Sequence, residues 1–131
     1  TARLGLSDRV VFVPWEKDLA AYYQTANLFL LSSRYESYCR TLVEAAATGL
    51  PFVSTDVGIA STLVEGGAQG SVLAQDDIAG FVDAMRTQVA LGRPAAGSGN
   101  EVISALTGKT EVEYRTRYRA TFDACAPLQK V

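Results

Sequence analysis

Residues 28–54 read LFLLSSRYESYCRTLVEAAATGLPFVS, and this stretch decides the fold class. The short apolar run Leu28–Leu31 predicts a buried strand, and the polar segment Ser32–Cys39 predicts a loop after it. A helix is expected over about Arg40–Thr48, because the Gly-Leu-Pro that follows it is a typical helix stop. Phe52–Ser54 then predicts the next strand. A strand, a helix and a second strand in this order indicate an α/β fold with a parallel, Rossmann-like sheet.

The flanking sequence continues the alternation of short apolar runs and helical patterns. Upstream, the pattern predicts a helix tail over Thr1–Leu6 and a strand over Val10–Val13 that Pro14 closes. A helix with Asp18 near its start is expected next. The face that it packs on the sheet is formed by Leu19, Tyr22, Tyr23 and Ala26. Downstream, it predicts a short helix that Ser61 could cap, a strand over Ser71–Leu73, a helix begun by Asp76 or Asp77 that ends near Gly92, and a last helix over about Glu111–Ala124. The helix after Asp77 is expected to cover the sheet with one apolar stripe, formed by Ile78, Phe81, Val82, Met85 and Val89. We divide the chain into a partial nucleotide-sugar-binding unit over 1–92, a linker over 93–100 and a helical segment over 101–131.

Composition removes several classes of function. The 131-residue chain has a net charge of −2, which gives no basic field for nucleic acid, so nucleic acid is not an expected partner. It has no histidine, which excludes Ser-His and Cys-His nucleophile systems and most catalytic zinc sites, and we expect no metal and no cofactor. Cys39 and Cys125 are expected to be reduced thiols. No apolar run approaches the ~20 residues that cross a bilayer, so we expect no transmembrane segment and a location in the cytoplasm or at the cytosolic face of a membrane.

Two glutamates carry the candidate chemistry. Glu36 lies in the loop after the strand, and Glu44 lies eight positions later inside an otherwise apolar helix. Open parallel sheets bind ligands at the carboxyl ends of their strands, where a helix amino terminus offers N–H groups and a partial positive charge to a diphosphate. An ionised carboxylate only accepts hydrogen bonds, so a pair of sugar hydroxyls suits it. A structural alternative is a capping box, in which Thr41 and Glu44 close the helix start.

This stretch resembles the group 1 family of retaining glycosyltransferases, which are built from two Rossmann domains. The shared pattern is two glutamates separated by seven residues, an Ala-rich turn, Gly-Leu-Pro, a strand and the Ser-Thr-Asp-Val-Gly of residues 54–58. The resemblance implies the carboxyl-terminal donor-binding domain of an enzyme that moves a sugar from a UDP- or GDP-sugar to an acceptor. The resemblance implies that Glu36 is the catalytic residue and holds hydroxyls of the donor sugar. It implies that Glu44 holds the ribose of the nucleotide. The donor-binding residues that it implies are Glu36, Ser37, Tyr38, Cys39, Arg40, Thr41, Leu42 and Glu44.

Several features depart from the family pattern. Ser37 and Cys39 stand where the family has a glycine and a second small residue. The family's Gly-Arg strand, the lysine that contacts the diphosphate and a further strand have no counterpart in this chain, so we expect the 131 residues alone to be inactive. An amino-terminal domain or another chain is expected to complete the sheet, and a homo-oligomer is an open alternative. Two other interpretations remain: a degenerate, inactive interaction module, and a sugar epimerase or phosphorylase of related architecture.

Overall fold

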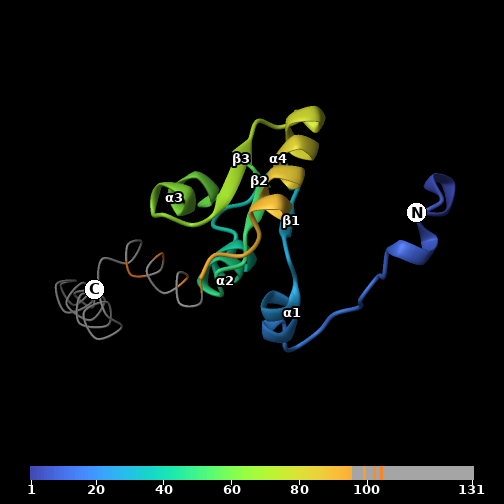
Figure 1. Ribbon diagram of the computed structural model, residues 1–131, viewed down its shortest axis with the longest axis horizontal. Coiled ribbons are helices and arrows are strands. Elements are labelled where there is room, and N and C mark those ends of the chain that lie inside the picture. Colours follow the sequence, from blue (N-terminus) through green and yellow to red (C-terminus); the bar gives the residue numbers. More distant parts are fainter. Residues whose placement is uncertain (96–98, 100–101, 103, 105–131) are drawn as a thin grey trace, which may run out of the picture.

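Three parallel strands with helices on both faces form the body of the protein (Figure 1). The structure is a computed structural model, and it describes residues 1–95, 99, 102 and 104. Two short 3-10 turns, Ala2–Leu4 and Ser7–Arg9, precede the body. The elements that follow are α1 (Ala20–Thr25), β1 (Phe29–Leu31), α2 (Arg40–Ala47), β2 (Phe52–Thr55), α3 (Ala60–Glu65), β3 (Gly70–Leu73) and α4 (Ile78–Leu91). The predicted α/β class and parallel sheet are confirmed.

The strands lie in the order β1-β2-β3, so that β2 is central. Phe29 pairs with Phe52, and Phe52 pairs with Gly70. A Cβ atom at position 70 would lie 2.6 Å from the Phe52 ring, so glycine there leaves room for the most buried aromatic side chain of the sheet. Because all three strands run the same way, their carboxyl ends meet at one edge. That edge is where a ligand site is expected.

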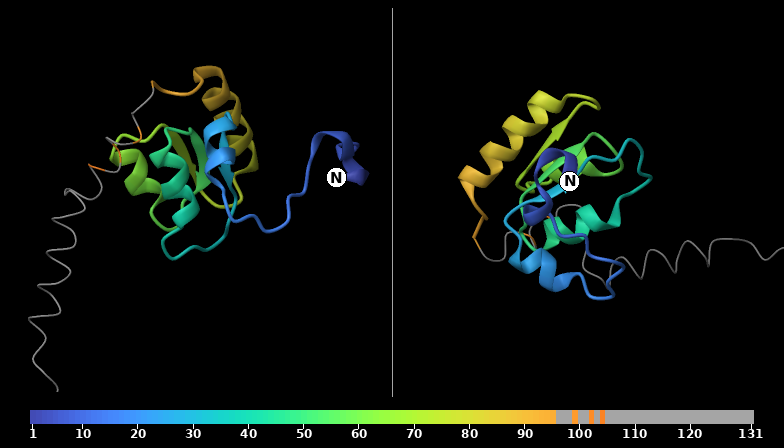
Figure 2. Two further views of the ribbon diagram at one scale, coloured as in Figure 1. Left: turned by 90° about the horizontal axis from the view of Figure 1, so that it is seen from below. Right: turned by 90° about the vertical axis from the view of Figure 1, so that its right-hand side faces the viewer.

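The helices divide between the two faces of the sheet. Helices α2 and α3 pack on one face and α4 on the other, as the left view of Figure 2 shows. The core between the sheet and α2 and α3 contains residues that are at most 8 % exposed: Cys39, Leu42, Ala46, Phe52, Ala60, Leu63, Ala68 and Val102. A smaller cluster of Tyr23, Ala45 and Leu50 fixes the other side of α2 against α1. Helix α2 is therefore held from two sides.

The strand predicted over Val10–Val13 is wrong. This segment has no strand partner among the described residues, and Val11 and Phe12 are 83 % and 81 % exposed. The two 3-10 turns at the amino terminus lie apart from the body (Figures 1 and 2). Local β propensity cannot form a strand without a neighbour to pair with. The strand after α1 is confirmed, although it is an edge strand rather than a buried one, and Leu30 is 45 % exposed.

Helix α4 is confirmed, but the face that it packs on the sheet differs from the prediction. Asp77 caps it, since its Oδ1 accepts the Gly80 N–H at 2.9 Å. Ile78 and Val89 are 77 % and 58 % exposed, whereas Gln88 is buried. The amide of Gln88 donates to Ser71 Oγ at 3.0 Å, which satisfies a polar side chain on the buried face.

Two further expectations were wrong at the level of local detail. Ser61 does not cap α3; it lies inside that helix, and its hydroxyl donates to Asp56 Oδ1 at 2.8 Å. The expected helix tail over Thr1–Leu6 is a single 3-10 turn.

The last helix expected over Glu111–Ala124 lies outside the described residues, as does Cys125. In the described part of the chain, the helices are all too short or too polar to cross a membrane.

Candidate functional site

The first predicted carboxylate, Glu36, lies in the loop that joins β1 to α2. Its side chain is partly exposed, and its Oε1 accepts a hydrogen bond from Ser33 Oγ at 2.9 Å. Ser33 comes two residues after the end of β1. Glu36 is therefore held close to the carboxyl edge of the sheet while part of its surface stays open to solvent.

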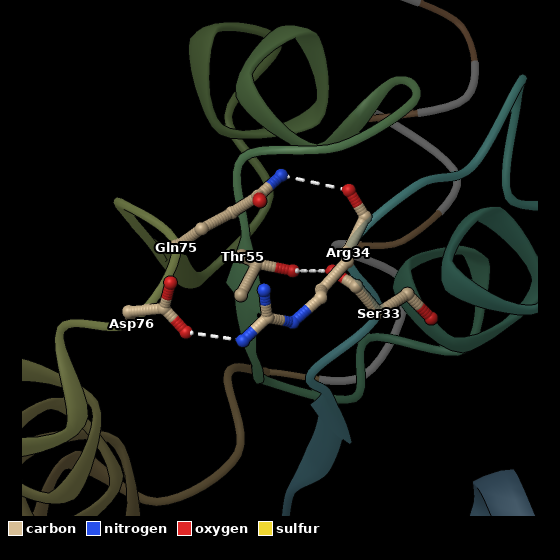
Figure 3. Close-up of polar contacts among 5 residues, drawn as sticks. All are labelled: Ser33, Arg34, Thr55, Gln75 and Asp76. Carbon is tan, nitrogen blue, oxygen red and sulfur yellow. Dashed lines mark hydrogen bonds and ion pairs between the residues drawn. The ribbon is translucent and has the colours of Figure 1, made fainter.

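Side chains from the ends of β2 and β3 fix the start of this loop (Figure 3). Thr55 Oγ1 donates to the Ser33 carbonyl oxygen at 2.6 Å, and Gln75 Nε2 donates to the Arg34 carbonyl oxygen at 2.7 Å. Arg34 also pairs with Asp76 at 2.7 Å, but both side chains are more than 70 % exposed, so this ion pair contributes little. The sequence did not predict that Thr55, Gln75 and Asp76 belong to the site, and Asp76 was expected only as a possible helix start. Their position just at the end of a predicted strand is the signal that could have found them.

A cavity of about 310 Å³ opens beside these contacts, on the α4 side of the strand ends. Its wall is apolar at Phe81 and Val82 and polar at Arg34 and Asp76. The predicted donor-binding residues do not line this cavity; they lie on the loop and on the first turns of α2.

The amino terminus of α2 begins in an unusual backbone conformation. Cys39 is the N-cap residue with φ of 65°, a left-handed conformation that residues other than glycine seldom adopt. The helix has no side-chain cap, so the capping box of Thr41 and Glu44 is wrong. The N–H groups of Arg40 and Thr41 find no acceptor among the described residues, and both residues are exposed. They are suitable donors to an anion.

The remaining residues of the predicted set differ in exposure. Ser37 and Tyr38 are exposed, whereas Cys39 is only 6 % exposed and the Leu42 side chain is fully buried. Gly58 packs under this loop: a Cβ atom there would lie 2.9 Å from the Tyr38 carbonyl oxygen. The loop therefore leaves Ser37 and Tyr38 exposed, and Cys39 together with Leu42 of α2 attaches its end to the core.

The second predicted carboxylate, Glu44, has two hydrogen-bond donors. Tyr23 OH donates to Oε2 at 3.3 Å, and Arg40 donates to Oε1 at 3.2 Å. The Glu44 side chain is 40 % exposed, so solvent reaches it. Burial raises the pKa of the Tyr23 phenol, and the charge of Glu44 and its hydrogen bond raise it further, with a smaller effect from Cys39. Glu36 thus lies in the loop before α2 and is held by Ser33, whereas Glu44 lies inside α2 and is held by Tyr23 and Arg40.

Comparison with known proteins identifies the family. Residues 1–90 match the sequence model described as Glycosyl transferases group 1. The chain is 42% identical over 85 residues to the lipopolysaccharide core biosynthesis mannosyltransferase LpsB of Rhizobium meliloti, which covers 63% of this chain and 24% of that protein. It is 37% identical over 86 residues to the D-inositol 3-phosphate glycosyltransferase of Nocardia farcinica, with coverage of 64% and 19%.

A solved structure agrees with these relatives. The sucrose-phosphate synthase from Thermosynechococcus elongatus superposes with a TM-score of 0.67 at 27% identity, over 91% of this chain and 33% of that chain. The chain spans about a quarter or less of the length of the two curated relatives named above. The sequence match, the parallel sheet and this structural likeness agree: the chain belongs to the group 1 glycosyl transferase family.

Proposed function

We propose that this chain forms the nucleotide-sugar-binding part of a glycosyltransferase that moves a sugar from a UDP- or GDP-sugar to an acceptor. One observation carries the proposal. In a member of this family, two partly exposed carboxylates lie on the loop and helix that follow β1: Glu36 in the loop after the strand end and Glu44 in α2. This is the position at which open α/β sheets bind nucleotides.

Each group has a role that suits its chemistry. Glu36 accepts hydrogen bonds from hydroxyls of the donor sugar and orients the reacting carbon, which makes it the catalytic residue of this part. Glu44 accepts hydrogen bonds from hydroxyls of the ribose. The diphosphate lies against the N–H groups of Arg40 and Thr41, which have no acceptor among the described residues, and the positive end of the α2 dipole favours negative charge there. The same dipole stabilises the charge that develops on the leaving diphosphate.

We propose that activity needs groups from outside the described residues. One helix terminus neutralises a diphosphate only in part, so cationic groups from elsewhere must stabilise the leaving group. The outer edge of β1 also has no strand partner among the described residues. We therefore propose that another part of the full-length protein, or another chain such as a second copy, pairs with this edge. The reaction is proposed to take place in the cytoplasm or at the cytosolic face of a membrane.

A second candidate function is that of an inactive interaction module. The extended amino-terminal segment favours it, because Val11, Phe12 and Trp15 are each more than 80 % exposed, and exposed apolar groups of this density mark interaction surfaces. Such a module needs no nucleotide. Nucleotide binding therefore separates the two candidates.

The test is calorimetric titration of the protein, at the full length that its gene encodes, with UDP, GDP and their sugar conjugates. The transferase proposal expects one of the two nucleotides to bind. Glu36→Gln should weaken binding of the nucleotide sugar and leave binding of the nucleotide diphosphate unchanged, because Glu36 is assigned to the sugar alone. Glu65→Gln, which makes the same change on an exposed glutamate of α3, is the control. If neither nucleotide binds, the interaction module is the better description.

A further inference from the structure

We infer that Tyr23 is a positioning residue that holds the Glu44 carboxylate in the orientation needed for ribose. The inference rests on the proposed function, since it concerns how Glu44 is prepared for its ligand. Tyr23 comes from α1, and no role for it follows from the motif that contains the two glutamates. Its hydroxyl lies 3.3 Å from Glu44 Oε2, across a separation of 21 residues in the chain.

The Tyr23 ring is held firmly by packing. It is 8 % exposed and belongs to the apolar cluster with Ala45 and Leu50, which attaches α1 to α2. The ring also meets Phe29 of β1 edge-on, with ring centroids 6.1 Å apart at an interplanar angle of 64°. Contacts from α2 and β1 therefore fix the ring, and the hydroxyl is a donor whose position is set before any ligand arrives.

Arg40, the other donor to Glu44, is bound much more loosely. Its side chain is 86 % exposed, and the pair is an i,i+4 contact on the helix surface. Such exposed pairs contribute little to stability, so Arg40 can leave the carboxylate at little cost when a ligand competes for it. Tyr23 then remains as the group that sets the carboxylate orientation.

The geometry leaves acceptor capacity for two sugar hydroxyls. A carboxylate has about four lone-pair sites, and the Tyr23 hydroxyl uses one of them on Oε2. Oε1 and the second site on Oε2 stay available once Arg40 moves. A carboxylate that is free to rotate would lose this fixed pair of acceptors, and with it much of its preference for two adjacent hydroxyls.

The experiment compares ribonucleotide with deoxyribonucleotide binding in the protein at its full encoded length. Dissociation constants are measured by calorimetry for UDP and 2′-deoxy-UDP, and for GDP and 2′-deoxy-GDP. The wild-type protein should prefer the ribonucleotide. Tyr23→Phe keeps the packed ring and should reduce that preference by at least about threefold, which is the order of coupling within one hydrogen-bond network. Tyr22→Phe removes a hydroxyl from the neighbouring, 45 % exposed tyrosine and should leave the preference unchanged.

Glu44→Ala separates failure of this inference from failure of the proposed function. If Glu44 binds ribose, Glu44→Ala should remove the preference, and adding Tyr23→Phe to it should change nothing more. A preference that survives Glu44→Ala, or a protein that binds none of the four nucleotides, refutes the ribose assignment and the inference together. A preference that Glu44→Ala removes but Tyr23→Phe leaves intact overturns only the role of Tyr23. If Tyr23 has a purely structural role, Tyr23→Phe should weaken binding of the ribonucleotide and of the deoxyribonucleotide equally, and the ratio of their dissociation constants should stay unchanged.

Discussion

The hydroxyl of Thr55 donates a hydrogen bond of 2.6 Å to the carbonyl oxygen of Ser33, which joins the end of β2 to the loop after β1 (Figure 3). Thr55 is 7 % exposed, so water does not readily replace it as a donor. Ser33 in turn donates to Glu36 at 2.9 Å. The central strand of the sheet is thus connected to the proposed catalytic carboxylate through two hydrogen bonds.

We predict that Thr55→Val lowers the free energy of unfolding by about 1 kcal/mol, because it leaves the partly buried Ser33 carbonyl group without its donor. Valine keeps the shape and the β-branched character of threonine, so strand propensity is preserved. Urea denaturation measures the change. Thr55→Ser retains a hydroxyl and should lose less stability than Thr55→Val. A Thr55→Val variant as stable as wild type would show that the hydrogen bond to Ser33 does not contribute to stability.

At Cys39, glycine should be better tolerated than alanine. The φ angle of 65° disfavours any side chain, and the alanine variant keeps that strain while losing the sulfur contacts with the core. Glycine relieves the strain, so we expect Cys39→Gly to be more stable than Cys39→Ala by about 1 kcal/mol. Chemical denaturation of both variants measures the difference between their free energies of unfolding. An alanine variant that equals or exceeds the glycine variant in stability would contradict the left-handed conformation.

Local chemistry allowed much of the body of the fold to be predicted from sequence. The end of α2 follows from Gly49, and the bounds of α4 follow from Asp77 and Gly92; both glycines have positive φ. The central strand was predictable because Phe52–Thr55 is buried on both faces, and a strand of this kind appears in the sequence as a short apolar run. These features depend on a few neighbouring residues, and the sequence displays them directly.

Contacts between distant segments could not be predicted in the same way. Val10–Val13 has the composition of a strand, but pairing depends on a neighbour that the local pattern does not specify. The Tyr23 contact with Glu44 depends on how α1 packs against α2, which a helical stripe leaves open. The loop that carries Glu36 and the helix that carries Glu44 were predictable, whereas the hydrogen-bond donors of the two carboxylates were not.

Tyr23 should make stability fall at alkaline pH. Its pKa lies above the ordinary value of 10.0 because of burial first, then the charge and hydrogen bond of Glu44, then Cys39. The folded protein therefore keeps this proton to a higher pH than the unfolded chain does. The stabilisation is complete below about pH 10 and is lost as the pH rises through the raised value. Urea denaturation from about pH 8 to 11 should show a shallower alkaline fall for Tyr23→Phe than for wild type. Parallel curves would contradict a Tyr23 phenol that titrates abnormally.

Glu44→Gln should separate the structural contribution of Glu44 from its proposed contact with ribose. Glutamine keeps the size and helix propensity, and its carbonyl oxygen can still accept from Tyr23. The variant loses only the exposed pair with Arg40, so the free energy of unfolding should fall by well under ~1 kcal/mol. Nucleotide affinity should fall much more. Hydrogen bonds to a charged acceptor contribute about 1.5–3 kcal/mol each, so partial loss of two predicts a decrease in affinity of roughly tenfold to a hundredfold.

The two quantities are measured on the same variant, by calorimetric titration with UDP or GDP and by urea denaturation, in the protein at its full encoded length. Glu65→Gln, on the exposed surface of α3, removes the same charge and should change neither the affinity nor the stability appreciably. If Glu44→Gln binds nucleotide as tightly as wild type while it loses stability, then Glu44 serves only the contact between α1 and α2. The assignment of ribose to Glu44 would then have to be withdrawn. A carboxylate that accepts hydrogen bonds from two hydroxyls cannot lose its charge without weakening those hydrogen bonds.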